Sequence, residues 1–254
     1  DGITISIHEA NLTNYSSMTL KANGTKNMEC DLIPWSDGVK VYSTRDIITP
    51  WRTIIVADNP AELTMSTLTL NLNEPNKLSK TEDWIKPGKY IGLWWEMIGT
   101  NQSTWGSGDE HGATTERVLE YIDFGSKYNF DGVLVEGWNM GWDENWCCTG
   151  EGESFGFYHP HPDFDNKKVA QYAQDKGIRI VGHHETGTQI KNYENQLDSA
   201  FAYCKRNGIR VVKTGYVNDG SQNIKRLGDD GKIYKEWHHG QYMVEHFRKV
   251  LETA

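Results

Sequence analysis

Four aliphatic, strand-like segments alternate with four amphipathic, helix-like segments after residue 89, and this order constrains the fold more than any other feature of the sequence. The segments with strand character span residues 90–95, 132–136, 178–183 and 209–213, and those with helix character span 115–128, 166–176, 190–206 and 240–252. Gly177 and Gly208 stand between a helix and the next strand, where a left-handed residue commonly ends a helix. The alternation predicts a parallel sheet built from βα units.

Each expected strand ends in polar or aromatic residues instead of further aliphatic ones. The four ends are Trp94-Trp95-Glu96, Glu136-Gly137-Trp138-Asn139, His183-His184-Glu185 and Lys213-Thr214-Gly215-Tyr216. Because the active site of a (β/α)8 barrel lies at the C-terminal ends of its strands, we interpret these residues as one wall of a pocket. A doubly wound open sheet would also bind ligands at strand ends, but no glycine-rich phosphate loop follows any of the strands.

The length of this region limits how much of a barrel it can form. Eight βα units need about 250 residues, whereas roughly 165 residues run from Lys89 to Ala254. We therefore predict an α/β fold in which residues 89–254 form the first four βα units, a truncated first half of a catalytic (β/α)8 barrel. A half barrel leaves two open sheet edges, so we expect the missing half to be supplied by the rest of a longer polypeptide.

Residues 1–75 follow a different pattern, in which apolar and polar residues alternate with period two. Strand-like runs separated by turn residues lie at 3–7, 18–20, 39–42, 54–56 and 63–72. Such runs are typical of an antiparallel β-sandwich without helices, and they are too few for a complete one. We predict that residues 1–75 are the C-terminal part of an N-terminal β-sandwich domain, joined to the barrel by a linker at 76–88.

Charge and hydropathy argue against two classes of partner. The formal net charge is -9, and the sequence has no concentrated Lys/Arg surface of the kind that nucleic acid requires. No apolar run approaches the ~20 residues that span a bilayer, and the first residues lack the features of a signal peptide. We therefore expect no nucleic-acid partner and no membrane insertion, and we expect a neutral substrate.

Tryptophan is concentrated around the first two strand ends. Six of the ten tryptophans fall within this stretch: Trp94, Trp95, Trp105, Trp138, Trp142 and Trp146. Aromatic faces stack on sugar rings, although large aromatic residues also fill protein cores. Core packing explains the tryptophans in loops least well, so we take Trp94, Trp95 and Trp138 as candidates for contact with a sugar.

Glu185 is the best candidate for a catalytic carboxylate, because it ends a strand beside two imidazoles and could activate water as a general base. Its alternative role is an ion pair at the barrel rim. A His/His/Glu metal site is a further possibility. Adjacent strand residues face opposite ways, so His183 and Glu185 should share a face and His184 should not, which argues against a metal held by all three.

Two more charged residues lie at strand ends. Lys213 could hold a sugar hydroxyl or stabilise an anionic neighbour, and a rim salt bridge is the alternative. Glu136 is a second carboxylate that could accept hydrogen bonds from sugar hydroxyls or take part in catalysis.

Several segments together resemble glycoside hydrolase family 97, in particular its inverting α-glucosidase branch. They are Lys89-Tyr90-Ile91-Gly92-Leu93-Trp94-Trp95-Glu96-Met97, Val135-Glu136-Gly137-Trp138-Asn139, Pro162-Asp163-Phe164-Asp165, Gly182-His183-His184-Glu185-Thr186 and Val212-Lys213-Thr214-Gly215-Tyr216. The resemblance implies an N-terminal β-sandwich, a central (β/α)8 barrel, a C-terminal β domain, a calcium ion in the active site and a periplasmic location.

Residue by residue, the resemblance implies that Glu185 is the general base and that His183 and Lys213 hold the sugar at the cleavage point. It implies that Glu9 is a calcium ligand from the sandwich domain. Retaining members place an aspartate nucleophile where this chain has Gly215, which favours inversion. The resemblance also places the general acid and the other calcium ligands beyond Ala254, so we expect the isolated chain to be inactive.

The function that we expect is hydrolysis of terminal α-glucosidic bonds in starch-derived oligosaccharides with inversion of configuration. An α-galactosidase of the same family is the nearest alternative. A non-catalytic sugar-binding module and a hydrolase dependent on a transition metal are alternatives from other classes.

Overall fold

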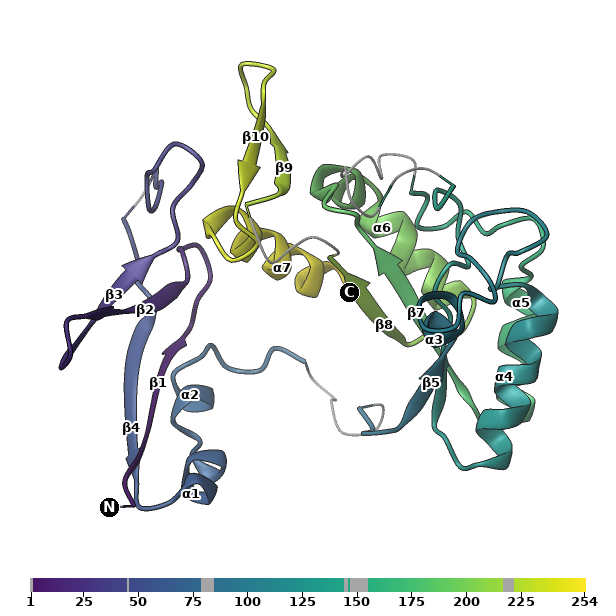
Figure 1. The fold of residues 1–254 in the computed structure, drawn as a ribbon, viewed down its shortest axis with the longest axis horizontal. Helices are drawn as coiled ribbons and strands as arrows, with labels where there is room; N and C mark the ends of the chain where they lie inside the picture. Colours follow the sequence, from purple (N-terminus) through teal and green to yellow (C-terminus); the bar gives the residue numbers. More distant parts are fainter. Residues whose placement is uncertain (1, 45, 79–84, 144–145, 147–154, 217–221) are drawn as a thin grey trace. The chain divides into compact units, whose positions relative to one another are not determined.

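A parallel sheet of four strands forms the centre of the C-terminal part of the chain (Figure 1). Its hydrogen-bonded order is β5 (Tyr90–Gly92), β6 (Gly132–Leu134), β7 (Arg179–Glu185) and β8 (Val211–Gly215). The computed structural model describes residues 2–44, 46–78, 85–143, 146, 155–216 and 222–254. Within them the chain forms two compact units, residues 1–81 with 234–252 (unit 1) and residues 82–233 with 253–254 (unit 2). The parallel sheet lies in unit 2 and confirms the predicted βα alternation.

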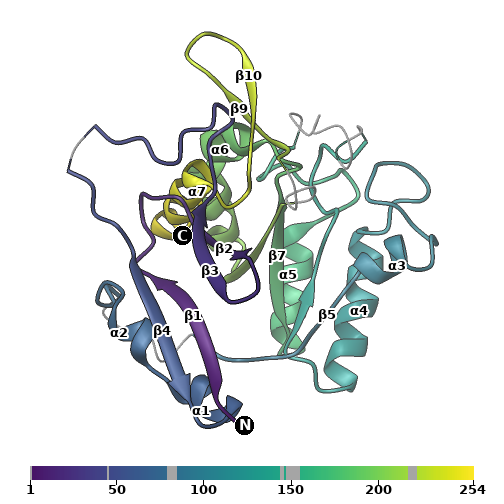
Figure 2. The same ribbon diagram turned by 60° about the vertical axis from the view of Figure 1, so that its left-hand side comes forward.

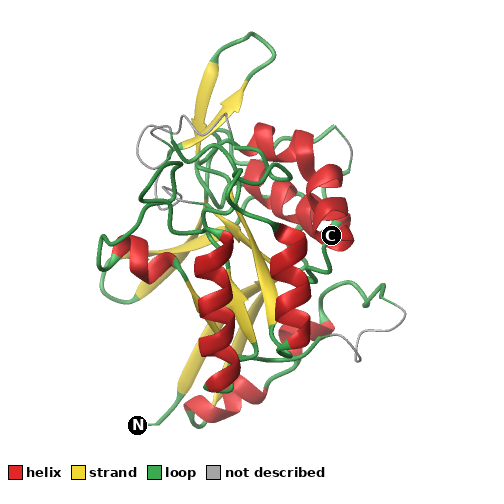
Figure 3. Ribbon diagram, turned by 90° about the vertical axis from the view of Figure 1, so that its right-hand side faces the viewer, coloured by secondary structure: helices red, strands yellow, loops and turns green. Residues whose placement is uncertain are grey.

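Long helices cover one face of this sheet (Figure 3). They are α4 (Thr115–Lys127), α5 (Asn166–Asp175) and α6 (Ile190–Arg206). Apolar side chains of these helices, including Val118, Val169 and Cys204, pack with Val133 and Ile180 of the sheet into one buried core. On α6 a buried apolar stripe is formed by Ile190, Tyr193, Leu197, Ala200 and Cys204, which confirms the amphipathic helix predicted at 190–206.

Local capping residues explain where the helices begin and end. Thr114 accepts a hydrogen bond from Arg117 N at 3.2 Å at the start of α4, and Asp165 caps α5 in the same way. Such caps satisfy backbone N–H groups that have no partner within the helix. Gly177 and Gly208 have φ angles of 71° and 70°, which confirms their predicted left-handed conformation.

The strand boundaries differ from the predicted ones. The first strand ends at Gly92 instead of residue 95, because Leu93 begins the short helix α3 (Trp94–Ile98) and its carbonyl accepts from Glu96 N at 3.0 Å. The second strand ends at Leu134, two residues early. By contrast, β7 and β8 continue to Glu185 and Gly215, because the polar residues expected beyond the strands still pair across the sheet.

Unit 1 contains two antiparallel strand pairs (Figure 2). They join β1 (Thr4–Ala10) to β4 (Trp51–Ala57), and β2 (Met18–Asn23) to β3 (Asn27–Leu32), a strand that the sequence pattern did not indicate. The predicted strand at 39–42 is wrong, because Trp35 N bonds Val39 O in a tight turn and Tyr42 N bonds the Gln241 side chain.

The predicted strand at 63–72, and with it the expected lack of helices in residues 1–75, is also wrong. This segment belongs to α1 (Pro60–Met65) and α2 (Leu68–Asn71). Asn59 caps α1 by accepting from Glu62 N, and Pro60 occupies the first helical position, where its missing N–H costs nothing. The start signals of a helix therefore outweigh the period-two pattern.

The remaining elements are β9 (Ile224–Leu227), β10 (Ile233–Glu236) and α7 (Gln241–Thr253). β9 and β10 form a two-stranded sheet. α7 is the last predicted helix, and all but its final residue groups with unit 1. Residues 79–84 of the predicted linker lie outside the described residues. Among the described residues, no helix is long and apolar enough to cross a bilayer.

Candidate active site

The polar strand ends of unit 2 converge on the face of the sheet opposite the helices. In the parallel register, His183 is opposite Lys213 and Glu185 is opposite Gly215. Successive strand residues point to opposite faces, so these four positions share one face. Glu136, one residue beyond the buried Val135, joins them, because its Oε2 lies 3.6 Å from His183 Nε2 and 3.8 Å from Lys213 Nζ. The structure thus brings together four of the predicted site residues.

Glu185 is only 3% exposed, and its carboxylate is held in place. Oε1 accepts a hydrogen bond from Gly187 N at 3.0 Å. Oε2 occupies the space beside the backbone of Gly215: a Cβ on residue 215 would lie 2.0 Å from Oε2 and 3.1 Å from His183 Nε2. The glycine at the end of β8 therefore makes room for the carboxylate at the end of β7.

Glu136 is a buried carboxylate with unusual electrostatics. Burial raises its pKa from 4.5 to about 7, and the negative charge of Glu185 acts in the same direction. Lys213 and the hydrogen bond from Trp105 Nε1 to Oε1, at 3.3 Å, lower the pKa and offset part of this rise. Its Oε2 is buried, and no donor among the described residues makes a hydrogen bond to it. Such an atom is suited to accept a hydrogen bond from a ligand.

The two adjacent histidines face opposite sides of the sheet, as predicted. His183 lies on the polar face, where burial and the charge of Lys213 hold its pKa well below the usual range, and its ring is therefore neutral at pH 7. His184 Nδ1 lies 3.0 Å from the Tyr193 hydroxyl of α6, and its Nε2 is 3.7 Å from Cys204 Sγ. Since His184 is a core residue, the three side chains cannot hold one metal ion together. No metal-binding group of three or more such residues occurs among the described residues.

The predicted tryptophans occupy two different environments. Trp94 and Trp95 lie on α3 instead of at the end of a strand, and they are 37% and 69% exposed. Both line a cavity of about 720 Å³ together with Tyr121, Phe124 and Lys213. Residues 90–92 of β5 also line this cavity. Of the candidate site residues, Trp94, Trp95 and Lys213 line it, and Glu136, His183 and Glu185 do not.

Trp138 is instead a core residue that holds the site from behind. It is 4% exposed and stacks on Tyr203 of α6 with ring centroids 5.6 Å apart. Its Nε1–H donates to the carbonyl of His183 at 3.0 Å. Contact between Trp138 and a sugar stays an untested prediction.

A stacked row of three rings lies beside Glu136, and of its members only His183 was among the predicted site residues. Trp105 stacks on Trp142 with centroids 6.2 Å apart, and Trp142 stacks on His183 at 6.1 Å. The high tryptophan content was a signal for these residues, but only the structure places them next to the carboxylates. Trp105 both bonds Glu136 and begins this row.

Glu9 lies at the end of β1 in unit 1, where it already has two partners. Its Oε1 is 2.6 Å from Arg52 Nη1, and its Oε2 accepts from Met18 N at 2.7 Å. Glu9 and Arg52 are opposite each other in the β1–β4 register. Among the described residues, Glu9 belongs to no group of three or more His, Cys, Asp or Glu side chains that could hold a metal ion. Calcium needs six to eight oxygen ligands, so further ligands would have to come from elsewhere.

Comparison with known proteins gives consistent matches along the chain. Residues 94–254 match the family described as Glycoside hydrolase 97, and residues 1–75 match the family described as Glycosyl-hydrolase 97 N-terminal. A retaining alpha-galactosidase from Bacteroides thetaiotaomicron is 22% identical over 251 residues, which cover 88% of this chain and 34% of that protein.

Two solved structures of a Glycoside Hydrolase Family 97 enzyme from Pseudoalteromonas sp. are more similar. Its complex with acarbose has a TM-score of 0.89 and 47% identity, covering 99% of this chain and 37% of that one. A variant in complex with panose has a TM-score of 0.88 and 46% identity, covering 99% and 38%. The chain therefore spans little more than a third of the length of the proteins that it matches.

Proposed function

This chain belongs to glycoside hydrolase family 97, and we propose that, in the full-length protein, it supplies the base-bearing half of an inverting α-glucosidase site. The observation that carries this proposal is the relation between Glu185 and Gly215. A carboxylate fills the space that a side chain at position 215 would need. A nucleophilic aspartate at that position, as retaining members have, is incompatible with the arrangement of Glu185.

The proposed reaction uses water as the nucleophile. Glu185 would remove a proton from a water molecule as the water attacks the anomeric carbon on the face opposite the leaving group. Inverting glycosidases hold the acid and the base about 6.5 to 9.5 Å apart so that this water fits between them. We propose that the acid comes from a part of the protein outside this sequence.

The other residues of the site would bind and orient the sugar. Neutral His183 can exchange hydrogen bonds with a hydroxyl without adding charge. Lys213, whose side chain is 46% exposed, can donate to a sugar oxygen while it faces Glu136. The exposed rings of Trp94 and Trp95 give apolar faces on which a second sugar ring could stack.

The ligands of the similar structures support a proposal for the substrate class. Acarbose and panose, the ligands of those structures, both contain α-linked glucose-like rings. We therefore propose terminal α-glucosidic bonds of starch-derived oligosaccharides as the substrate. An α-galactoside is the second candidate, because the retaining relative is an alpha-galactosidase.

Calcium dependence and a periplasmic location are also proposals, and both come from the family resemblance. Glu9 is the only ligand that we assign to calcium within this sequence. Its ion pair with Arg52 would have to open for the carboxylate to bind the ion.

The stereochemistry of the first product tests the proposal. The full-length protein should release β-glucose from panose, as seen by proton NMR before mutarotation, and Glu185→Gln should abolish this reaction without loss of folding. Release of α-glucose would contradict inversion. Binding of panose without hydrolysis would instead indicate a sugar-binding module, and preferential cleavage of α-galactosides would support the second candidate.

A further inference from the structure

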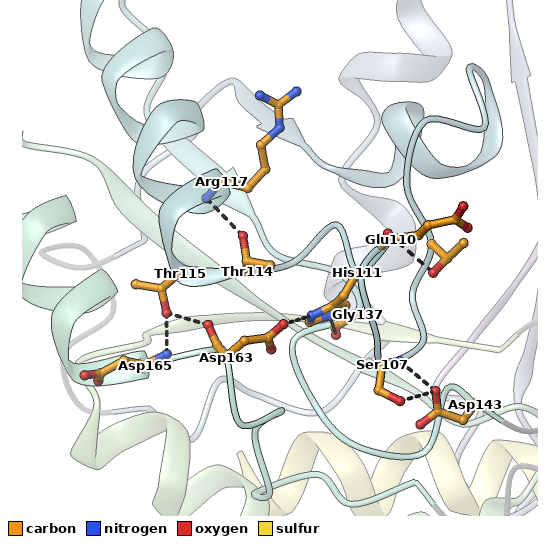
Figure 4. Close-up of polar contacts among 11 residues, drawn as sticks. Ser107, Glu110, His111, Thr114, Thr115, Arg117, Gly137, Asp143, Asp163 and Asp165 are labelled. Carbon is orange, nitrogen blue, oxygen red and sulfur yellow. Dashed lines mark hydrogen bonds and ion pairs between the residues drawn. The ribbon is translucent and has the colours of Figure 1, made fainter.

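His111 is a fully buried histidine outside the proposed site whose two ring nitrogens both face oxygen atoms (Figure 4). Nδ1 lies 2.8 Å from Asp163 Oδ2, and Nε2 lies 3.0 Å from the carbonyl oxygen of Gly137. A carbonyl only accepts hydrogen bonds, so Nε2 must donate. The carboxylate oxygen of Asp163 is likewise an acceptor, so hydrogen-bond acceptors face both nitrogens of the ring.

The Gly137 carbonyl belongs to the residue that follows Glu136. Val135 N bonds Val181 O at 3.2 Å, and beyond this contact the chain leaves the sheet. Gly137 has a φ of 86°, in the left-handed region that other residues avoid. A Cβ there would also lie 3.3 Å from Trp105 Cδ1. The backbone next to Glu136 is therefore not fixed by β-sheet pairing.

Contacts from the loop around residue 161 fix the rest of this segment. His161 N donates to Trp138 O at 2.9 Å, and Asn139 pairs with Pro160. Asp163 is anchored in turn, because its carbonyl accepts from both N and Oγ1 of Thr115 at the start of α4. The His111 ring thus connects the side chain of Asp163, a residue with an anchored backbone, to the carbonyl of the residue that follows Glu136.

We propose that His111, held by Asp163, is a positioning residue that fixes the carboxylate of Glu136 through the Gly137 carbonyl. This inference rests on the proposed function, because Glu136 matters for activity only if the site processes a sugar. His111 bonds the backbone of Gly137, the neighbour of Glu136, so we expect it to act through that backbone and not on the substrate.

Two amide substitutions separate the two contacts of His111. In His111→Gln the amide nitrogen lies near the position of Nε2 and can still donate to Gly137 O. In His111→Asn the amide lies near the position of Nδ1, so it can bond Asp163 but cannot reach Gly137. Both new side chains are polar and no larger than histidine. A loss of packing alone would therefore lower the activity of both variants.

In the full-length protein we expect His111→Asn to lower kcat for panose by about 10- to 100-fold, the range typical of residues that orient an active-site group. His111→Gln should recover most of this loss, and KM should change less than kcat in both. His159→Ala is the matched control, because His159 is an exposed histidine in the same loop as His161. Equal losses of kcat in the Gln and Asn variants would overturn the proposal.

A second measurement does not depend on activity. Carbon NMR can follow the titration of Glu136. The groups that face Glu136 are Lys213, His183, Glu185 and Trp105. Those that face His111 are Asp163, His161 and Asp143. In His111→Asn the Glu136 pKa should fall toward its ordinary value, because a displaced carboxylate becomes better solvated. An unchanged pKa of Glu136 in His111→Asn would contradict the positioning role, whether or not the wild type is active. An inactive wild type would contradict only the proposed function.

Discussion

The carboxylate of Glu185 fills the space beside Gly215, so that a Cβ on residue 215 would come within 2.0 Å of Oε2. The two residues are directly opposite each other at the ends of β7 and β8. A side chain at 215 and this position of the carboxylate are therefore mutually exclusive. The absence of a side chain at position 215 therefore allows the Glu185 carboxylate to lie where it does.

Gly215→Ala should displace the Glu185 carboxylate and lower kcat by about 100-fold, because small misplacements of a catalytic group have effects of this size. The clash is with the flexible end of a side chain, so the melting temperature should change little. Gly125→Ala in α4 is a suitable control, since a Cβ there meets only ordinary contacts at 3.6 Å or more. A fully active Gly215→Ala variant would argue against Glu185 as the base.

Glu136→Gln should become more stable relative to the wild type as the pH rises. The pKa of Glu136 is about 7 in the folded protein and 4.5 ordinarily, so its contribution to stability is complete below pH 4.5 and is lost as the pH rises through 7. The shift corresponds to at most about 3 kcal/mol. Denaturant unfolding of both proteins at pH 5 and pH 8 measures the change, and a constant difference between them would disprove the shift.

Lys213→Met should raise the pKa of Glu136 above about 7, because the ammonium group lowers it in the wild type. Lys213→Arg keeps the positive charge and should leave the value nearly unchanged. The carboxyl titration seen by NMR checks both variants. If the methionine variant titrates like the wild type, the 3.8 Å ion pair does not exist in solution.

Glu96→Gln should destabilise unit 2 by about 1.5 to 3 kcal/mol, the range for hydrogen bonds to charged groups. Glu96 Oε2 accepts from Arg117 Nε at 2.9 Å and from the Tyr121 hydroxyl at 3.0 Å, which ties α3 to α4. Burial raises the pKa of Glu96, but the bonds from Arg117 and Tyr121 outweigh it and leave the pKa below its ordinary value. The effect of the substitution should therefore shrink as the pH falls through that pKa.

Glu120→Gln is the control for this comparison, since Glu120 contacts the same Arg117 at an exposed site. Surface ion pairs contribute about 1 kcal/mol or less, so this substitution should have a small effect. Equal effects of the two substitutions would show that Glu96 does not connect the helices.

Removal of calcium from the full-length protein should lower its activity, and Glu9→Gln should raise the calcium concentration that restores it. If Glu9 serves only as the partner of Arg52, the substitution should lower stability and leave the calcium requirement unchanged. Zinc chelation should have no effect, and loss of activity through zinc removal alone would favour a transition-metal hydrolase.

The sequence by itself determined the order of the four parallel strands of unit 2 and of the helices α4, α5 and α6, but not the short helix α3 or the strand β9. The periodic apolar stripe of α6 and the glycines after α5 and α6 are local signals, since helix capping and amphipathicity depend on residues a few positions apart. The period of two along β7 was enough to place His183 and Glu185 on one face and His184 on the other. In unit 1 the same period misled at residues 63–72, because the cap at Asn59 favours a helix.

Only the tertiary structure decided how these residues act on one another. Glu136 and Lys213 are 77 positions apart in the sequence, and their 3.8 Å contact arises because β6 and β8 both flank β7. Burial, which raises the pKa of Glu136 and keeps His183 neutral, is a property of the packed sheet. The contact of His111 with Gly137 likewise joins two loops that have no common pattern in the sequence. Contacts between distant segments depend on the whole fold, and for that reason the local sequence could name the members of the site but not their arrangement.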